Sequence, residues 1–310
     1  MYVARLINSA SNCYLNSTLQ GLAACTQLID DFRQLEIKYQ NIESLKIFNN
    51  LLKSITGSKS AKVNAFQSNL FINWKKRGQQ DSFEVLTYAI SEVYKELRKK
   101  ENVNDIEKWV NFELPMRFIM GYDIKCCNNH VIACPKQVAL ALHVPIIEKS
   151  NGKSDKISGL SIQSLVNKYL DETEIEDYVC DDCSKTDSKN NENKSEIKAK
   201  KFSQILSPLP RTICVHLQRT RWINGSMKKL TDSIKIDEKL EITYQNNDNK
   251  PITNQFSLKA VIVHSGNIFF GHYVCYRLCS DKWYFTSDST VKESDIKTVM
   301  SQQPYILFYE

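Results

Sequence analysis

The chain has 310 residues, of which 42% are apolar and 25% charged, a composition typical of a globular protein with a substantial core. Its mean hydropathy is -0.39, and no stretch holds the ~18 uninterrupted apolar residues of a membrane-spanning helix. The 41 basic and 35 acidic residues give a net charge of +6. Because the two signs are interspersed along the chain, this charge does not indicate a nucleic-acid-binding protein.

Helical periodicity dominates the first third of the chain. A short helix is predicted around Asn16 to Leu28, and a second periodic stretch runs from Leu35 to Ile55, with Gly57 as its stop. The clearest amphipathic helix begins at Ser82, with Asp81 or Ser82 itself as the cap.

The last third of the chain is typical of β-strands. Four short segments are rich in β-branched and aromatic residues: Ile213 to Leu217, Leu258 to His264, Tyr273 to Arg277 and Tyr305 to Tyr309. Helices first and strands later predict an α+β fold rather than alternating βαβ units. Three polar segments are predicted to be loops: Glu148 to Lys156, Asn246 to Asn254 and the charged run Ser184 to Lys201, which we expect to be mobile.

The chain contains ten cysteines, and their spacing is not that of a dense disulfide scaffold. No secretory signal opens the sequence, so we expect a reducing compartment. Cysteines in such a compartment are commonly metal ligands, nucleophiles or small core residues.

Cys13 is a candidate nucleophile because it stands where a polar turn enters a predicted helix. The free amides and the helix dipole at that point favour the thiolate, so we expect a lowered pKa. Asn8 and Asn12 offer amide donors to a developing oxyanion. A buried structural thiol is the alternative for a lone cysteine.

A catalytic cysteine requires a histidine, usually distant in sequence, and His272 is the strongest of five candidates. It follows Gly271, which frees space beside it, at the start of a predicted strand. The segment Trp283 to Val291 carries polar residues able to orient an imidazole. His216 and His264 lie within apolar strands, where we expect structural histidines.

Several segments together resemble the ubiquitin-specific protease family of cysteine deubiquitinases. Leu6 to Gln20 is similar to the family's cysteine box, G-L-x-N-x-G-N-T-C-Y-M-N-S-x-L-Q, and Gln79 to Leu86 to its Q-Q-D-x-x-E-F-L element. Leu209 to Arg219 resembles L-P-x-x-L-x-x-H-L-K-R-F, while His264 to Tyr273, Trp283 to Val291 and Tyr305 to Tyr309 resemble the histidine box and terminal strand. These elements follow the family's order and cover nearly the whole chain.

The resemblance implies a papain-like cysteine protease fold in a single catalytic domain, residues 1–310. We expect a helical thumb at about residues 1–112, zinc-ribbon-like fingers at about 113–205 and a β-rich palm at about 206–310, with the mobile insert 184–201 in the fingers. It also implies thiol-dependent hydrolysis after the C-terminal glycine of ubiquitin, through an acyl-enzyme thioester.

Motif positions imply a role for individual residues. Cys13 would be the nucleophile, His272 the general base and Asn8 an oxyanion donor. Substrate-binding roles fall on four residues of the Q-Q-D element and the histidine box: Gln80, Asp81, Glu84 and Tyr273. Asp81 and Glu84 would hold the arginine-bearing ubiquitin tail; the alternative is that they are a helix cap and an exposed helical charge.

The third position of the triad departs from the common pattern. Most family members have Asn or Asp where this chain has Ser287, and the family's following Asp is kept as Asp288. Serine here resembles the mitochondrial outer-membrane member of the family. A hydroxyl accepts the imidazole N–H but stabilises imidazolium less than a carboxylate does. We expect Ser287 to orient His272 and Asp288 to support it; direct orientation by Asp288 is the alternative.

Cys180 and Cys183 form a C-x-x-C pair. Cys127 and His130 form a second pair, and the four residues make a Cys₃His set suited to structural zinc. The resemblance places the two pairs at the tips of separate finger hairpins. Cys126 in place of Cys127, and a degenerate site with free thiols, are the alternatives. No cofactor is expected for catalysis.

Departures in the cysteine box motivate a second function hypothesis, a catalytically weak or inactive ubiquitin-binding scaffold. Arg5 and Ala10 replace family glycines, and Asn12 replaces threonine. Retention of Cys13, His272 and Asn8 favours the enzyme. A zinc-ribbon nucleic-acid binder is a third hypothesis, which the absence of a basic aromatic tract disfavours. We expect a monomer that binds ubiquitin and its conjugates and no nucleic acid. We expect no membrane segment within these 310 residues, with an anchor upstream of them as the alternative. We also expect it to face the cytosol, at the mitochondrial outer membrane by resemblance and otherwise in the cytoplasm.

Overall fold

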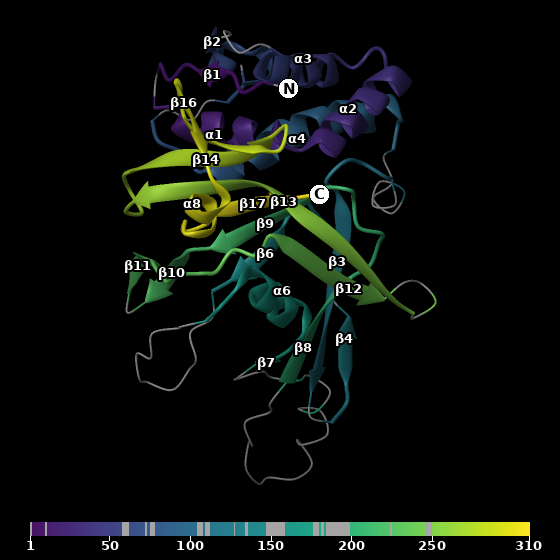
Figure 1. The fold of residues 1–310 in the computed structure, drawn as a ribbon. Helices are drawn as coiled ribbons and strands as arrows, with labels where there is room; N and C mark the ends of the chain where they lie inside the picture. The colour runs from purple at the N-terminus through teal and green to yellow at the C-terminus, as the bar shows by residue number, and fades with distance from the viewer. Residues whose placement is uncertain are drawn as a thin grey trace.

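The computed structural model describes residues 2–9, 11–57, 62–71, 73–74, 78–103, 108, 112–126, 128–133, 136–146, 159–175, 180, 183, 199–223, 225–245, 248 and 250–310. Helices occupy the N-terminal part and a large sheet the C-terminal part, so the α+β prediction is confirmed (Figure 1). The helices are α1 (Cys13–Leu22), α2 (Thr26–Lys38), α3 (Glu43–Gly57), α4 (Ser82–Lys100), α6 (Ile162–Leu170) and α8 (Ile296–Met300), with 3-10 turns η1 (Ala65–Gln67) and η2 (Asn69–Phe71).

The central sheet has eight strands in the order β16-β15-β14-β13-β17-β9-β6, and β12 also pairs with β13. All of its pairings are antiparallel except that of β6 with β9. Its strands are β6 (Leu142–Pro145), β9 (Ile213–Gln218), β12 (Lys239–Gln245), β13 (Pro251–Gly266), β14 (Gly271–Cys279), β15 (Lys282–Ser287), β16 (Thr290–Ser294) and β17 (Ile306–Tyr309).

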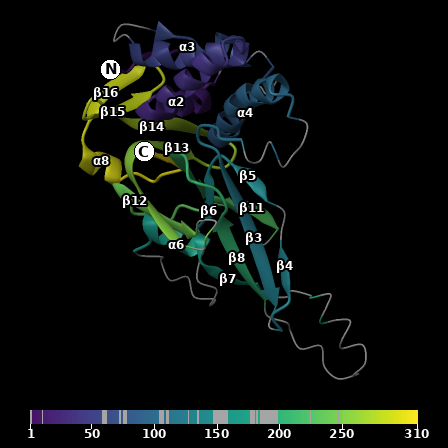
Figure 2. The ribbon, with the colours of Figure 1, turned by 90° about the vertical axis from the view of Figure 1, so that its right-hand side faces the viewer.

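A second sheet extends away from the helices, in the order β4-β3-β8-β7 with β5 on β3 (Figures 1 and 2). Its strands are β3 (Phe118–Cys126), β4 (Val131–Ala133), β5 (Gln137–Ala139), β7 (Glu172–Ile175) and β8 (Ala199–Ile205). Two small sheets pair β1 (Arg5–Leu6) with β2 (Lys62–Val63), and β10 (Thr220–Ile223) with β11 (Ser226–Lys229).

Helix α1 lies at the centre of the molecule, with all ten of its residues buried. It packs against α3 and α4 on one side and against β13, β14, β15 and β17 on the other. Gly21 permits this close approach, because a Cβ there would lie 2.6 Å from the Phe308 ring. The alternation of strand side chains then divides the core: Ile306 and Phe308 face the helices, while Leu307 and Tyr309 face the opposite cluster around α6.

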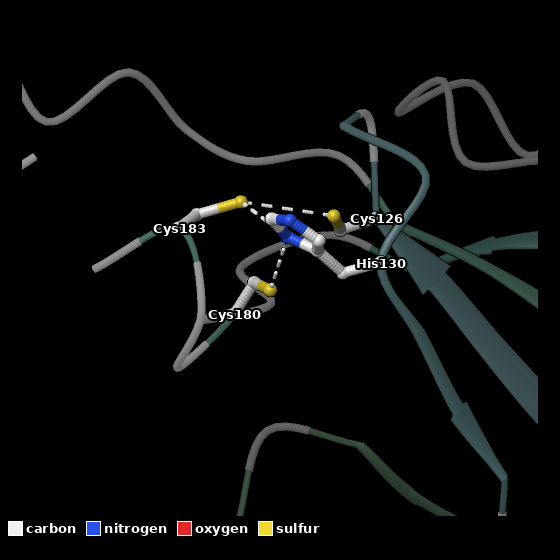
Figure 3. Close-up of side chains that lie close together, drawn as sticks. All are labelled: Cys126, His130, Cys180 and Cys183. Atoms are coloured by element: carbon white, nitrogen blue, oxygen red, sulfur yellow. Dashed lines mark hydrogen bonds between the residues drawn. The ribbon is translucent and has the colours of Figure 1, made fainter. Parts of the chain in front are cut away.

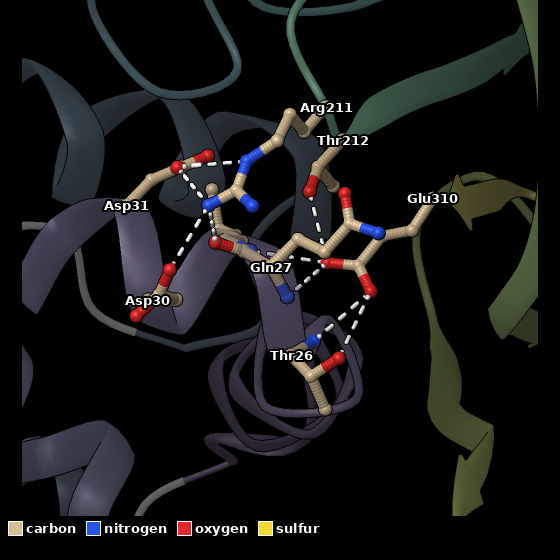
Figure 4. Close-up of polar contacts among 8 residues, drawn as sticks. Thr26, Gln27, Asp30, Asp31, Arg211, Thr212 and Glu310 are labelled. Atoms are coloured by element: carbon tan, nitrogen blue, oxygen red, sulfur yellow. Dashed lines mark hydrogen bonds and ion pairs between the residues drawn. The ribbon is translucent and has the colours of Figure 1, made fainter.

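Two polar contacts fix the helices to the sheet. Buried Arg277 on β14 donates to the Gln20 side chain (2.8 Å) and to the Ala23 carbonyl at the end of α1. The Glu310 carboxylate accepts backbone N–H groups of Thr26 (3.1 Å), Gln27 (2.8 Å) and Leu28 (3.0 Å), which caps α2 (Figure 4).

Arg211 lies beside this cap and binds Asp30 and Asp31 of the same helix (Figure 4). Glu310 directly follows β17 and Arg211 shortly precedes β9, so the two contacts join the first turns of α2 to the central sheet.

The structure corrects four sequence expectations. The periodic stretch predicted from Leu35 to Ile55 is interrupted, because α2 ends at Lys38 and α3 begins at Glu43. The helix predicted over Asn16 to Leu28 is two helices, because the chain turns at Ala23–Cys25. Pro251 to Asn254 are not loop but the start of β13, since they pair with β12. Ala199 to Lys201, placed in a mobile run, belong to β8 and pair with β3 and β7. The rest of that run and the whole of the predicted loop Glu148 to Lys156 lie outside the described residues.

Candidate active site

Cys13 is the first residue of α1 and is buried, with 3% of its surface exposed. The backbone N–H groups of Tyr273 on β14 and of Tyr14 in the first turn of the helix act on its sulfur to lower the pKa of the thiol. Tyr273 directly follows His272. The packing of α1 on β14 therefore brings the cysteine from one end of the chain beside the strand that carries the histidine.

Burial raises the pKa of the Cys13 thiol, the backbone N–H of Tyr273 opposes this rise, and the negative charge of Asp288 adds to it. The expected lowering of the pKa is therefore wrong for this state of the protein. The helix-terminal amides do act on the sulfur as expected, but the loss of water around it outweighs them.

His272 is held by the neighbouring strand. Its Nε2 lies 2.8 Å from Oγ of Ser287, the last residue of β15. Gly271 before it is required, because a Cβ there would lie 2.1 Å from Nε2 of His264. The sequence predicted that Gly271 frees space beside His272, and in the structure the His264 ring lies in the space that a side chain at position 271 would take.

Asp288 binds the segment that carries the cysteine. Its carboxylate accepts Nδ2–H of Asn8 (2.9 Å) and Nδ2–H of Asn16 (2.7 Å), and its carbonyl accepts the N–H of Leu6 (3.1 Å). Its φ of 51° places it in the left-handed region, at the turn that follows Ser287. Asn8 in turn accepts the N–H of Asn12 at 2.8 Å.

Asn16 is a site residue that sequence reasoning missed. It lies in the cysteine box, one helical turn after Cys13, and this spacing was the available signal. Its Nδ2 also donates to the Ile7 carbonyl (3.3 Å), so one buried amide joins Asp288 to the strand before the cysteine.

Asp81 is the N-cap of α4, as the sequence predicted. Its Oδ1 accepts the N–H groups of Phe83 (2.8 Å) and Glu84 (2.9 Å), while Oδ2 accepts the hydroxyls of Tyr273 (3.3 Å) and Tyr305. Glu84 is exposed in the first turn of the helix.

Gln80 is half-buried just before the cap. Its neighbour Gln79, also missed by sequence reasoning, accepts the N–H of Gly271 at 2.9 Å. The start of α4 is thus bonded to the start of the histidine strand.

The other described histidines differ from His272 in their surroundings. Nδ1 of His143 and Nδ1 of His216 lie 3.1 Å apart, and burial lowers the pKa of His216 to about 4. Burial and the charge of Lys229 lower the pKa of His264 to about 4. The His216 and His264 rings are therefore neutral near pH 7, and we interpret them as structural histidines.

A cluster of Cys126, His130, Cys180 and Cys183 joins the tip of β3 to a segment far along the chain (Figure 3). The Sγ atoms of Cys126 and Cys183 lie 3.7 Å apart, and Nδ1 of His130 lies 3.5 Å from Cys180 Sγ and 3.3 Å from Cys183 Sγ. Tetrahedral zinc with Zn–S bonds of about 2.3 Å requires sulfurs about 3.8 Å apart. The donor set fits zinc in chemistry and spacing; Cys127 lies outside the described residues.

Comparisons with known proteins agree with this arrangement. The family model "Ubiquitin carboxyl-terminal hydrolase" matches residues 4–309. The chain is 27% identical to "Ubiquitin carboxyl-terminal hydrolase 11" of Schizosaccharomyces pombe, over 97% of this chain and 82% of the relative. It is 24% identical to "Ubiquitin carboxyl-terminal hydrolase 3" of Homo sapiens, over 98% of this chain and 67% of the relative.

A third relative, "Ubiquitin carboxyl-terminal hydrolase 30" of Xenopus tropicalis, is 21% identical over 99% of this chain and 81% of its own. Among solved structures, "Structure of the SAGA Ubp8/Sgf11/Sus1/Sgf73 DUB module bound to ubiquitin aldehyde" matches with a TM-score of 0.71 and 21% identity, over 99% of this chain and 69% of that one. This likeness shows a shared fold. The chain belongs to the ubiquitin carboxyl-terminal hydrolase family of cysteine-type deubiquitinating hydrolases.

Proposed function

We propose that this deubiquitinase uses Cys13 as its nucleophile and His272, oriented by Ser287, as its general base. The observation that carries the assignment is the distance of 2.8 Å between His272 Nε2 and Ser287 Oγ, together with the packing of α1, which begins at Cys13, on the strand β14 that carries His272. Because Nε2 is engaged with Ser287, Nδ1 is the nitrogen that takes the thiol proton.

The reaction has two stages. Cys13 transfers its proton to His272 and attacks the carbonyl carbon of ubiquitin's last residue, which forms a tetrahedral oxyanion. Collapse of this intermediate breaks the C–N bond; the leaving amine takes the proton from His272, and a thioester remains. Water then attacks the thioester with His272 as base, which releases the ubiquitin carboxylate and the Cys13 thiol.

Asn8 supports the oxyanion in this proposal. One hydrogen of its Nδ2 goes to Asp288, and the amide carries a second that is suited to the developing negative charge. Asp288, held on its other oxygen by Asn16, fixes the direction of that amide. Asp288 is thus a positioning residue for the oxyanion side of the site, whereas Ser287 serves the base.

The start of α4 is the proposed binding site for the ubiquitin tail. Exposed Glu84 offers a carboxylate to the tail's arginine, and Gln80 offers an amide beside it. Asp81 acts mainly through its fixed contacts, because its two oxygens already accept helix amides and tyrosine hydroxyls. Tyr273, stacked on His264 at 4.4 Å, would line the narrow path to the cysteine.

We propose that zinc is a structural ion of the fingers, bound by Cys126, His130, Cys180 and Cys183. A closed set of four protein ligands has no open position for substrate, so it stabilises structure rather than performing chemistry. Its role is to join two segments that are more than fifty residues apart in sequence.

We further propose a monomer that faces the cytosol, at the mitochondrial outer membrane by likeness to the relative from Xenopus tropicalis and otherwise in the cytoplasm. None of the cysteines in the described ranges forms a disulfide, which suits a reducing compartment. Among the described helices, none combines the length and apolarity that crossing a bilayer demands. Nothing in the comparisons or in the described residues favours the non-catalytic scaffold.

Ubiquitin with an electrophilic C-terminus tests the assignment. Under reducing conditions the wild-type chain should be labelled, with peptide mapping placing the adduct on Cys13, and Cys13→Ala should stay unlabelled while still binding ubiquitin. Cys25→Ala is the matched control, because Cys25 is a fully buried cysteine of the same core and should not change labelling. An unlabelled wild-type chain, or an adduct on another cysteine, would overturn the proposal.

A further inference from the structure

A cavity of about 760 Å³ lies between α4 and the finger strands β3, β5 and β8. One end of it is lined by Phe83 and His143, next to the cap of α4. The lining includes five cationic side chains, so we call this cavity the basic cavity: Lys95, Arg98, Lys99, Arg117 and Lys201.

The charge of this lining is all of one sign. Among the described residues that line the cavity there is no aspartate or glutamate. The cations come from three separate parts of the chain, α4, the segment before β3, and β8, so the fold and not one basic run gathers them. A cleft with walls of low dielectric and one sign of charge concentrates counter-ions of the opposite sign.

Three of the cations, Arg98, Arg117 and Lys201, are at least partly buried. Lys95 and Lys99 are exposed, and Nζ of Lys95 lies 3.7 Å from the Glu92 carboxylate. Arg117 is buried, with 6% of its surface exposed. Nε of Arg98 donates to the Val103 carbonyl at 3.0 Å, and Nζ of Lys201 lies 4.3 Å from the centre of the Tyr122 ring. Burial lowers the pKa of Arg117, and the charge of Arg98 lowers it further, as expected where positive charges face one another.

We propose that the basic cavity is an oxyanion-binding site that takes a multiply charged phosphate-type or carboxylate group. Guanidinium groups bind such anions through paired N–H donors, and lysines add point charges. Two sources share this chemistry: a free phosphate-type ion, or an acidic or phosphoryl group on a ubiquitin conjugate bound at the neighbouring start of α4. The second source rests on the proposed function, whereas the first does not.

Inorganic pyrophosphate is the probe, titrated calorimetrically at fixed ionic strength. The wild-type chain should bind it, and the double variant Lys99→Gln/Lys201→Gln should weaken binding at least about tenfold, because two charged contacts are removed. The control is Lys53→Gln/Lys100→Gln, which removes the same charge from exposed lysines that do not line the cavity. It should change the dissociation constant by less than about twofold.

Thermal melting of both double variants verifies that they fold. Absence of pyrophosphate binding to the wild-type chain, or equal weakening in the control, would overturn the proposal. The titration involves no turnover, so it stands even if the ubiquitin probe fails to label Cys13. Repeating it on the chain labelled with that probe separates the two sources: lost binding assigns the cavity to a group on ubiquitin, and retained binding assigns it to a free anion.

Discussion

Ser287 gives His272 a neutral partner. Its hydroxyl fixes the direction of the imidazole through the 2.8 Å contact with Nε2, but it brings no charge to stabilise imidazolium. The carboxylate that follows it is turned away, since Asp288 is occupied by Asn8 and Asn16. In a Ser-His-Asp triad one carboxylate supplies both orientation and charge, whereas here Ser287 orients the imidazole and the Asp288 carboxylate binds Asn8 and Asn16 instead.

Ser287→Ala should lower kcat by roughly tenfold to a hundredfold, because the imidazole loses the group that orients it. KM should change little, since Ser287 is not at the tail-binding end of the site. Ser287→Asn, which restores an acceptor, should recover part of the loss. Steady-state hydrolysis of a fluorogenic ubiquitin substrate measures both constants. Thr290→Ala, in register opposite Ser287 on β16, is the control and should behave as the wild type; equal loss in both variants would contradict the assignment.

Asp288 also acts through its charge on Cys13, the proposed nucleophile. It raises the pKa of Cys13, so Asp288→Asn should lower that pKa and move the midpoint of Cys13 alkylation by iodoacetamide to lower pH. Turnover should nevertheless fall, because the amide replaces one of the two oxygens that hold Asn8 and Asn16. Asp281→Asn removes an equal charge from another hairpin turn with positive φ and should leave the midpoint unchanged. A midpoint that rises in Asp288→Asn would be inconsistent with this role.

At the scale of elements, β6, β9 and α4 meet at a pair of histidines. His216 stacks on Phe83 at 4.4 Å, and its Nδ1 lies 3.1 Å from Nδ1 of His143, so one ring donates and the other accepts. Protonation of both rings would leave two donors facing each other. Burial lowers the pKa of both histidines, that of His216 to about 4, and so keeps the pair neutral.

This pair should make the fold sensitive to acid. The folded pKa of His216 lies below the unfolded value near ~6.5, so the unfolded state binds the proton first and stability falls as pH drops from 6.5 toward 4. Between pH 7 and pH 5 this histidine should account for about 2 kcal/mol of lost unfolding free energy. Urea denaturation at the two pH values measures the loss, and His216→Gln should reduce it. Gln218→Ala, at an exposed position of β9, should not; an unchanged pH dependence in His216→Gln would refute the assignment.

Elements with their own local signals were predictable from sequence. Asp81 caps α4 and Gly57 ends α3, as predicted. Such signals can be recognised in sequence because a helix cap or stop depends on only a few neighbouring residues. Pro251 to Asn254 and Ala199 to Lys201 were not predictable, since their strand state depends on distant partners. For example, the hydroxyls of Thr243 and Thr253 bond across β12 and β13 at 2.9 Å. Polar composition alone indicated loops at both places.

The same distinction applies to the site. Cys13, His272 and Ser287 could be named because they would touch the reacting atoms and stand in recognisable motifs. Asn16, Gln79 and Tyr305 act through other residues, by holding Asp288, Gly271 and Asp81, and sequence alone does not show which neighbour a side chain will bind. The direction of the Cys13 pKa was also out of reach, because it depends on burial by both ends of the chain.

For the whole molecule, the site is made by bringing the chain's two ends together. Asn8 and Cys13 come from the N-terminal segment, and His272, Ser287 and Asp288 from adjacent strands near the C-terminus. Helix α1 is packed between the helices and the sheet, and Glu310 caps α2, so the helical layer and the sheet hold each other in register. The base of the fingers sheet packs on the cluster around α6 through Phe118, Met120 and Ile205, whereas Cys126, Cys180 and Cys183 at its far end form a separate cluster.

Removal of the metal should therefore loosen the fingers and leave the helical core around Cys13 intact. The cluster of Cys126, His130, Cys180 and Cys183 lies at the far end of the fingers, whereas Cys13 lies in the helical core. Treatment with a zinc chelator should lower the melting temperature by about 10 °C or more, because structural zinc contributes several kcal/mol to folding. Labelling by the ubiquitin probe should slow as the fingers loosen, while alkylation of Cys13 by iodoacetamide should keep its rate.

Cys183→Ser supplies the control for the chelation experiment. This variant should already melt at the lower temperature, and the chelator should cause no further change. Elemental analysis of the wild-type chain should find one zinc per molecule, and that of Cys183→Ser much less. A chain that contains no zinc, or whose melting is the same with and without chelator, would show that the four side chains hold the fingers as free thiols and an imidazole. If the chelator slowed probe labelling and iodoacetamide alkylation of Cys13 equally, the fingers and the helical core would unfold as one unit. Loss of the metal can affect the distant Cys13 to that extent only if both regions unfold in the same transition.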